Sequence, residues 1–322
     1  MKEKKETARI EEIDFLKGVL IVLMISFHLV FIEQKYPYVK QVVYAFHMPA
    51  FLLVSGYLMN IDKSWQPFFR TIVCFLIPYV VMESGYIVMA SLLPINEHIE
   101  QLTAEVFVEK LLFHPIGPYW YLQTLIVCGL TYYVVFRRQS VRFVTRVILL
   151  GMLYGCYAYF VKIIYLPYAL YFLGGAVLRQ SGISFWTFFM PSPLAVVAIV
   201  LLTVFPQHLH AESVGSTLIV WTAVSSIFLF HQHASQNIRR IVCFLGRHTL
   251  SLFLFSPIFT FLCKFLVPYL EKEPTGLLFL MVALSINIGG CLCIAWTIRS
   301  VMALHDRTEG GPAGRGVRSG PG

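Results

Sequence analysis

The sequence has few charged residues. Only 13% of its 322 residues are Asp, Glu, Lys or Arg, whereas 57% are hydrophobic, and soluble domains carry about twice that share of charge. Most of the surface must therefore face something other than water. No polar stretch is long enough to build a separate soluble domain. These absences predict a single all-α integral membrane domain surrounded by membrane lipids.

Clustered charge and paired cysteines are also lacking. The formal net charge is +8, but the basic residues are spread over alternate short connectors, which indicates membrane topology and not nucleic-acid binding. All seven cysteines lie inside apolar segments, where a thiol behaves as a small hydrophobe, so neither a disulfide framework nor a zinc site is expected. The first apolar run has no small-residue cleavage site, which favours a retained first helix over a signal peptide.

Ten apolar stretches have about the length that a helix needs to cross a bilayer, roughly 20 residues. They lie near residues 11–32, 41–60, 69–93, 119–136, 143–161, 164–178, 185–205, 214–231, 250–270 and 276–299. The sixth is short and the seventh contains Pro191 and Pro193, which is typical of a kinked or re-entrant segment. We therefore predict about ten transmembrane helices.

The Lys/Arg distribution predicts the orientation of these helices. With ten spans both termini lie on one side, and every arginine then falls on that side, whereas the longest connector on the other side, 94–118, is acidic. Basic residues favour cytoplasmic connectors, so both termini are expected in the cytoplasm. Residues 1–305 form the predicted transmembrane domain. Residues 306–322 are rich in Gly and Pro and are expected to be a disordered cytoplasmic tail.

Ionisable residues inside membrane spans are costly and mark candidate sites. Lys17 and His28 are eleven residues apart on the first span, which is nearly three helical turns and roughly 16 Å of rise, so they share one face at different depths. Asp14 lies one turn before Lys17 and is placed to pair with it. Lys17 alone is explained by snorkelling to the headgroups. His28 has no such explanation and favours a functional role.

Of four further residues, three allow two interpretations each and Trp120 allows one. His47 precedes Pro49 and the pair Ser55–Gly56, a pattern that fits either a polar cavity or close helix packing. Glu83 is the only acidic residue deep in a span and serves either as structural hydrogen-bond partner or as proton acceptor. Trp120 suits an interfacial aromatic belt. Arg247 suits headgroup contact, with anion binding as the alternative.

Six motifs, taken in order, resemble the acyltransferase-3 family of bacterial membrane acyltransferases. They cover nearly the whole chain, and the first two are most similar to the branch described as fucose 4-O-acetylase-related. The motifs are RIEEIDFLKGVLIVLMISFH, FHMPAFLLVSGYLM, FFRTIVCFLIPY, PYWYLQTL, YALYFLGGAVL and LGRHTLSLFLFSP.

The resemblance implies a ten-helix enzyme of the bacterial inner membrane. Acyl-CoA, commonly acetyl-CoA, would be its cytoplasmic donor substrate, with no permanently bound cofactor. A hydroxyl of a surface polysaccharide, or of its lipid-linked sugar precursor, would accept the acyl group.

The resemblance also assigns residues. His28 matches the essential histidine of the family, Lys17 the preceding basic residue, and Arg70 the basic position at the start of the third helix. Ser55, Gly56 and Tyr57 match its Ser-Gly-aromatic motif. Two positions depart from the pattern: Lys17 replaces a frequent arginine and offers no bidentate fork, and Ser256 stands where many members carry a second histidine.

These features suggest a mechanism and leave an alternative. CoA phosphates would bind near Lys17 and Arg70, with Arg247 as a further candidate, and the thioester would extend along the first helix to His28. His28 would act as base or carry the acyl group briefly, with Glu83 or His47 orienting it. A polysaccharide or small-molecule transporter is the competing interpretation, because broken helices with polar residues also suit translocation.

Overall fold

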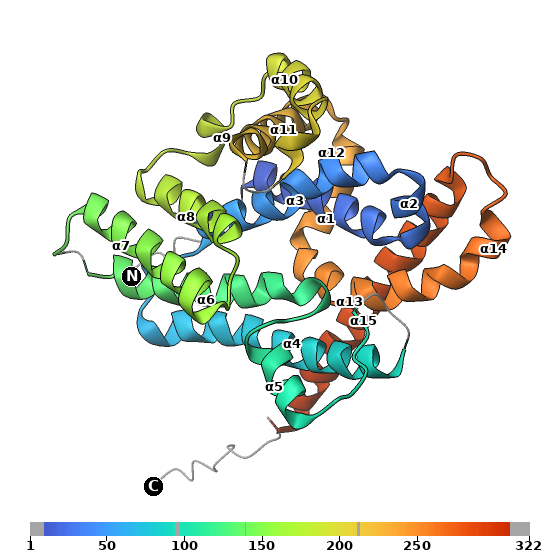
Figure 1. Ribbon diagram of the computed structural model, residues 1–322, viewed down its shortest axis with the longest axis horizontal. Coiled ribbons are helices and arrows are strands. Elements are labelled where there is room, and N and C mark those ends of the chain that lie inside the picture. Colours follow the sequence, from blue (N-terminus) through green and yellow to red (C-terminus); the bar gives the residue numbers. More distant parts are fainter. Residues whose placement is uncertain (1–9, 94–96, 139, 211–212, 310–322) are drawn as a thin grey trace, which may run out of the picture.

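The computed structural model describes residues 10–93, 97–138, 140–210 and 213–309, and every regular element in this part of the chain is helical (Figure 1). The helices are α1 (Glu11–His28), α2 (Val30–Lys35), α3 (Pro37–Leu58), α4 (Trp65–Leu92), α5 (Ala104–Leu112), η1 (Gly117–Tyr119), α6 (Trp120–Phe136), α7 (Phe143–Cys156), η2 (Tyr157–Val161), α8 (Leu166–Gln180), α9 (Phe185–Phe188), α10 (Pro193–Thr203), η3 (Pro206–Leu209), α11 (Val214–His233), α12 (Gln236–Arg247), α13 (Thr249–Leu262), η4 (Cys263–Leu266), α14 (Val267–Leu270) and α15 (Leu277–Glu309).

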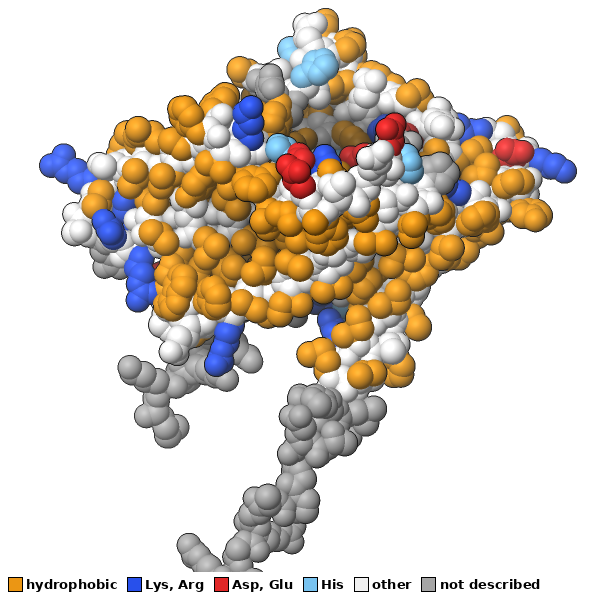
Figure 2. Space-filling view, turned by 60° about the horizontal axis from the view of Figure 1, so that its bottom comes forward, with side chains coloured by type: hydrophobic (Ala, Val, Ile, Leu, Met, Phe, Trp, Pro, Cys, Tyr) orange, Lys and Arg blue, Asp and Glu red, His pale blue; other side chains and the backbone are white. Residues whose placement is uncertain are grey.

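Seven helical segments of the described chain are long and apolar enough to cross a membrane. They are Pro37–Leu58, Trp65–Leu92, Gly117–Phe136, Phe143–Val161, Val214–His233, Thr249–Leu270 and Leu277–Met302. The other three predicted spans correspond to α1, whose first turns are charged, to α8 with 15 residues, and to α9 and α10, which are short. Hydrophobic side chains form a broad band across the face seen in Figure 2, and acidic and histidine side chains gather around a hollow at the edge of this band. The chain is therefore an all-helical multi-pass membrane protein.

The first predicted span, 11–32, is not one continuous helix. α1 ends at His28 and Leu29 is extended, with φ −78° and ψ 108°, so α2 is a separate short helix. Side chains contact two carbonyls near this end, and that of Phe27 is one of the terminal carbonyls that lack a helical partner. The His28 ring lies 2.7 Å from the Met24 carbonyl oxygen, and the Tyr44 hydroxyl donates to Phe27 at 3.1 Å. The break thus depends partly on α3, which sequence periodicity alone does not reveal.

The helix α12 is absent from the predicted spans. It is a 12-residue amphipathic helix whose N-cap, Ser235, accepts from the backbone N–H of Ile238 at 3.4 Å. The expected span 185–205 is in turn divided into α9 and α10, which are separated at the Pro191–Pro193 segment. The proline interpretation of that segment is therefore confirmed.

Two glycine contacts bring helix backbones together. A Cβ on Gly56 of α3 would lie 2.1 Å from the Phe172 carbonyl oxygen of α8. On the other side of the bundle, a Cβ on Gly18 would lie 2.0 Å from the Val242 carbonyl oxygen, and one on Gly246 would lie 1.7 Å from that of Asp14. Only glycine permits such close approach. The second contact fixes α12 against the first half of α1.

We name the two ends of the bundle after the predicted orientation. The end with Lys17, Lys63 and Arg247 is called the inner end, and the end with Lys35, Lys110 and Lys162 the outer end. α15 continues to Glu309, four residues into the predicted tail. The basic residues before Ile10 and the rest of that tail lie outside the described residues.

Candidate active site

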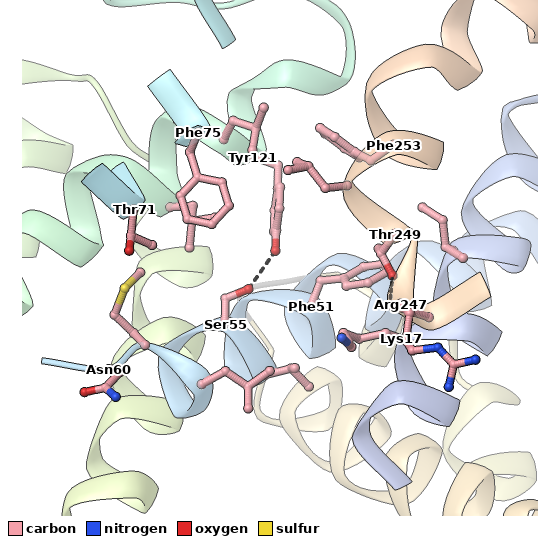
Figure 3. A pocket seen from close by; sticks show the side chains of 18 of the residues that line it. Lys17, Phe51, Ser55, Asn60, Thr71, Phe75, Tyr121, Arg247, Thr249 and Phe253 are labelled. Carbon is pink, nitrogen blue, oxygen red and sulfur yellow. Dashed lines mark hydrogen bonds between the residues drawn. The ribbon is translucent and has the colours of Figure 1, made fainter. Parts of the chain in front are cut away.

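A cavity of ≈ 320 Å³ lies where α1, α3, α4, α6, α12 and α13 meet. Its walls are largely apolar, and Met48, Phe51, Leu122 and Phe253 are among the side chains that form them. Figure 3 shows Lys17 and Arg247 on one side of this cavity, Asn60 and Thr71 on the other, and Ser55 and Tyr121 between them. The cavity is thus cationic and polar at the inner end and apolar along its length.

Three cations line this cavity. Lys17 Nζ lies 2.7 Å from Asp14 Oδ1, the i,i+3 contact that the sequence predicts, and Lys17 keeps part of its side chain exposed. Arg247 is brought to the cavity by the contact of Gly246 with α1. Lys63, which precedes α4, is the third. Sequence reasoning included Lys63 only as a topology signal, and its place at the cavity depends on the connector between α3 and α4.

Arg70 is the one residue of the predicted donor set that is not in this cavity lining. It lies in the first turns of α4 and is exposed, and the lining includes the neighbouring Thr71 but not Arg70. The Ser55 hydroxyl lies 2.7 Å from the Tyr121 hydroxyl in the cavity wall. Gly56 contacts α8, and the Tyr57 hydroxyl accepts from the backbone N–H of Phe185 at 3.3 Å. Of this motif only Ser55 lines the cavity.

His28 and His47 are brought together by one tyrosine. The rings of His28 and Tyr44 are stacked with centroids 5.6 Å apart, and the rings of Tyr44 and His47 are 5.0 Å apart. His47 is buried, with 2% of its surface exposed, and His28 is half-buried. Met48 lines the cavity one residue after His47. We call His28, Tyr44 and His47 the imidazole cluster.

Both imidazoles are held in the same way. Nδ1 of His28 lies 2.7 Å from the Met24 carbonyl oxygen, and Nδ1 of His47 lies 2.9 Å from that of Val43. A carbonyl oxygen only accepts, so Nδ1 must donate in each case, and the neutral ring then carries its lone pair on Nε2. Nε2 of His47 is buried without a hydrogen-bond partner. The cluster therefore offers two imidazole nitrogens that can accept a proton.

A charged pair adjoins the imidazole cluster. Lys40 is ion-paired with Glu33, and its Nζ lies 5.1 Å from the centre of the Tyr44 ring. Sequence reasoning missed Glu33, Lys40 and Tyr44 as site residues. The i−4 spacing of Tyr44 and Lys40 on α3 indicated that they share a face, but their contact with His28 depends on the turn between α1 and α3.

Glu83 and Trp120 interact with other parts of the outer end. Glu83 is fully buried and its Oε1 accepts from the backbone N–H of Ile116 at 2.8 Å, which ties α4 to the loop before α6. The Oε2 atom is buried without a hydrogen-bond partner. Trp120 stacks on Tyr168 of α8, with centroids 4.7 Å apart. These contacts agree with the structural interpretation of both residues and do not test a catalytic one.

Comparison with known proteins identifies the family. No curated protein and no solved structure matches the chain. A family model described as an acyltransferase domain matches residues 10–296, and so includes the cavity, its three cations and the imidazole cluster. The protein therefore belongs to the acyltransferase-3 family and is a membrane acyltransferase that transfers groups other than aminoacyl groups.

Proposed function

We propose that the protein moves an acyl group, in the simplest case acetyl, from cytoplasmic acyl-CoA to a hydroxyl of a surface polysaccharide or its lipid-linked sugar precursor in the bacterial inner membrane. One observation carries the proposal: a single cavity has cations at the inner end and reaches Met48, the residue after His47 of the imidazole cluster. His28 and His47 are not among the residues that line it. An anionic donor with a long, mostly uncharged arm fits a site of this kind.

A second cavity supports the donor assignment. It measures ≈ 420 Å³, adjoins the first at Arg247, and is lined by Arg239 and Arg240 of α12. Glu11 and Asp14 are its acidic members. Nε of Arg239 is buried without a hydrogen-bond partner, and guanidinium groups suit phosphate binding. The phosphorylated nucleotide would lie here, and the pantetheine arm would enter the first cavity between Lys17 and Lys63.

The imidazole cluster supplies the base. His28 Nε2 takes the proton of the acceptor hydroxyl as its oxygen attacks the thioester carbonyl carbon, and the carbon–sulfur bond then breaks. The CoA thiolate leaves and takes the proton from the imidazolium. The bond from Nδ1 to the Met24 carbonyl fixes the ring tautomer through both steps. Tyr44 and His47 hold the ring position and are positioning residues.

The test is turnover of acetyl-CoA by purified protein with a candidate glycan. The variant His28→Ala should lose roughly 10²- to 10⁴-fold in turnover, the usual size of a general base effect. His233→Ala is the matched control, because His233 makes the same Nδ1 contact with the carbonyl four residues earlier, at 2.9 Å, but is exposed at the end of α11. Full turnover in His28→Ala would contradict the mechanism.

The same assay separates acyl transfer from transport. CoA release that depends on the glycan is expected of an acyltransferase. Movement of glycan into vesicles without acyl-CoA would instead favour a transporter.

A further inference from the structure

The largest of the described cavities lies away from the donor site. It measures ≈ 1020 Å³ and is bounded by η2, α8, α9 and α11, and by Leu53 of α3. Its lining is mostly apolar, with Leu170, Phe188 and Trp221 among its walls, and also includes Tyr171 and Thr217. It follows α8 from Tyr165, just before the first residue, to Ser181, just after the last. Fifteen helical residues span roughly 22 Å, most of the ~30 Å hydrocarbon core.

A smaller cavity continues this space at the outer end. It measures ≈ 380 Å³ and lies among the loop before α6, the start of α6 and the start of α8. The two cavities share Ala158, Ile164 and Tyr165 in their walls. A single elongated ligand can therefore occupy both, with its apolar part between the helices and its other part at the outer end.

The smaller cavity has a different chemistry. It is lined by the stacked rings of Trp120 and Tyr168, and by His114, Gln123 and Lys162. Aromatic rings pack against the C–H faces of sugars, and amide and imidazole groups bond to hydroxyls. The lysine ammonium adds a positive charge that suits a phosphate. A hydrocarbon chain, a phosphate and a sugar are the three parts of a lipid-linked sugar.

We propose that the joined cavities bind a lipid-linked sugar, with its hydrocarbon chain along α8 and its phosphate and sugar against Trp120, Tyr168 and Lys162. The proposal rests on the proposed function, because this ligand would be the acyl acceptor. Trp120 and Tyr121 are consecutive on α6, and Tyr121 lines the donor cavity. The two ligands would thus lie on either side of one aromatic pair, whose ring centroids are 6.5 Å apart.

Filling the apolar cavity tests the proposal. Gly174 lines it, and a Cβ there would meet nothing within 4 Å, so Gly174→Leu places its side chain in the cavity without a backbone clash. Gly155 of α7 is equally open but lines neither cavity, and Gly155→Leu is the matched control. The probe is dansyl-tagged polyisoprenyl-phosphate glucose. Its dissociation constant is measured by fluorescence with full-length protein in detergent.

We expect Gly174→Leu and Trp120→Ala each to weaken probe binding about tenfold or more, and Gly155→Leu to change it less than about twofold. Dansyl-tagged phosphatidylglycerol should bind more weakly and should not respond to Trp120→Ala. Unchanged probe binding in Gly174→Leu overturns the proposal, as does equal binding of phosphatidylglycerol, which would mean that bulk lipid fills the space.

Donor binding keeps the two proposals distinguishable. Acetyl-CoA affinity, measured by calorimetry, should be the same in Gly174→Leu and in the wild type. If the wild type binds the probe as expected but never transfers acetyl from acetyl-CoA, the acyl-transfer proposal fails and the lipid site remains. If transfer to a soluble glycan occurs and the Gly174→Leu variant binds the probe normally, only the lipid-site inference fails.

Discussion

The two imidazole rings of the cluster are held by the same kind of hydrogen bond, and this bond affects what they can do in catalysis. In each, Nδ1 donates to the carbonyl four residues earlier on the same helix. The helix therefore sets the ring orientation and leaves Nε2 free to exchange protons. His28 is also the last residue of α1. Its ring therefore lies where the chain begins to turn toward α3.

A prediction at the residue scale concerns which basic residue binds the donor. The structure favours Lys63, whereas the family pattern favours Arg70. Lys63 and Arg70 are both exposed, but only Lys63 lines the donor cavity. Lys63→Ala should raise the KM for acetyl-CoA about tenfold with little change in kcat, because a charge-assisted contact contributes ~1.5–3 kcal/mol. Arg70→Ala should change this KM less than about threefold. Steady-state kinetics at varied donor concentration measure both. An effect of Arg70→Ala larger than that of Lys63→Ala would reverse the assignment.

At this scale, local sequence spacing predicts local contacts only. The pairing of Asp14 with Lys17 follows from i,i+3 geometry and is confirmed at 2.7 Å. Placing Lys63 at the cavity, or Tyr44 between two histidines, requires the packing of connectors and of separate helices. No periodicity within one helix contains that information.

Among the elements, α12 connects the donor site with the rest of the fold. Its glycine at 246 contacts the α1 backbone, and its next residue, Arg247, lines both inner cavities. The geometry of the donor site thus depends on a 12-residue helix that is not among the candidate membrane spans. The close fit also makes α12 sensitive to a single methyl group.

An element-scale prediction follows for Gly246→Ala. Its Cβ would clash with the Asp14 carbonyl, so the variant should lose ~1–3 kcal/mol of stability and should show a raised KM for acetyl-CoA. Gly85→Ala in α4 is the control, because its Cβ meets nothing within 4 Å; it should be neutral or up to ~1 kcal/mol more stable. Thermal unfolding in detergent and donor kinetics measure the two effects. Equal behaviour of both variants would refute the packing account.

Sequence patterns predict the elements unequally. Long apolar runs such as 69–93 correspond to single helices, because burial in lipid requires length and apolar composition together. The criterion of length and apolar composition does not detect α12, because its sequence, QNIRRIVCFLGR, is short and half polar. The same criterion does not predict that α1 ends at His28, because Tyr44 on another helix donates to one of the terminal carbonyls of α1.

At the scale of the whole molecule, the two predicted substrates approach from opposite ends. The donor cavities carry Lys17, Lys63, Arg239, Arg240 and Arg247 at the inner end, and the joined lipid cavities open among outer-end loops. The same basic residues predict the orientation and line the donor cavities. The proposed donor site and the predicted orientation are therefore tested together.

The prediction at this scale concerns sidedness. Acetyl-CoA does not cross bilayers, so vesicles that expose the inner end should consume added acetyl-CoA, and sealed vesicles of the opposite orientation should show less than about a tenth of that rate. Detergent permeabilisation should restore it. Protease accessibility of a tag on the C-terminus provides the orientation of each preparation. Equal rates in both sealed preparations would refute the predicted orientation.

The contact between α1 and α12 also bears on biosynthesis. The Cys243 thiol lies 3.6 Å from the Glu11 carbonyl oxygen, and these residues are 232 positions apart in the chain. During synthesis from the N-terminus, the first helix reaches the membrane long before α12 is made. The surface around Gly18 is therefore not yet covered by α12. A chain cut short before α12 would keep most of its apolar helices. It would lack the α12 arginines that we propose bind the donor, and its first helix would lack the contact with α12. Assembly of the donor site is therefore a late event, completed from the C-terminal end.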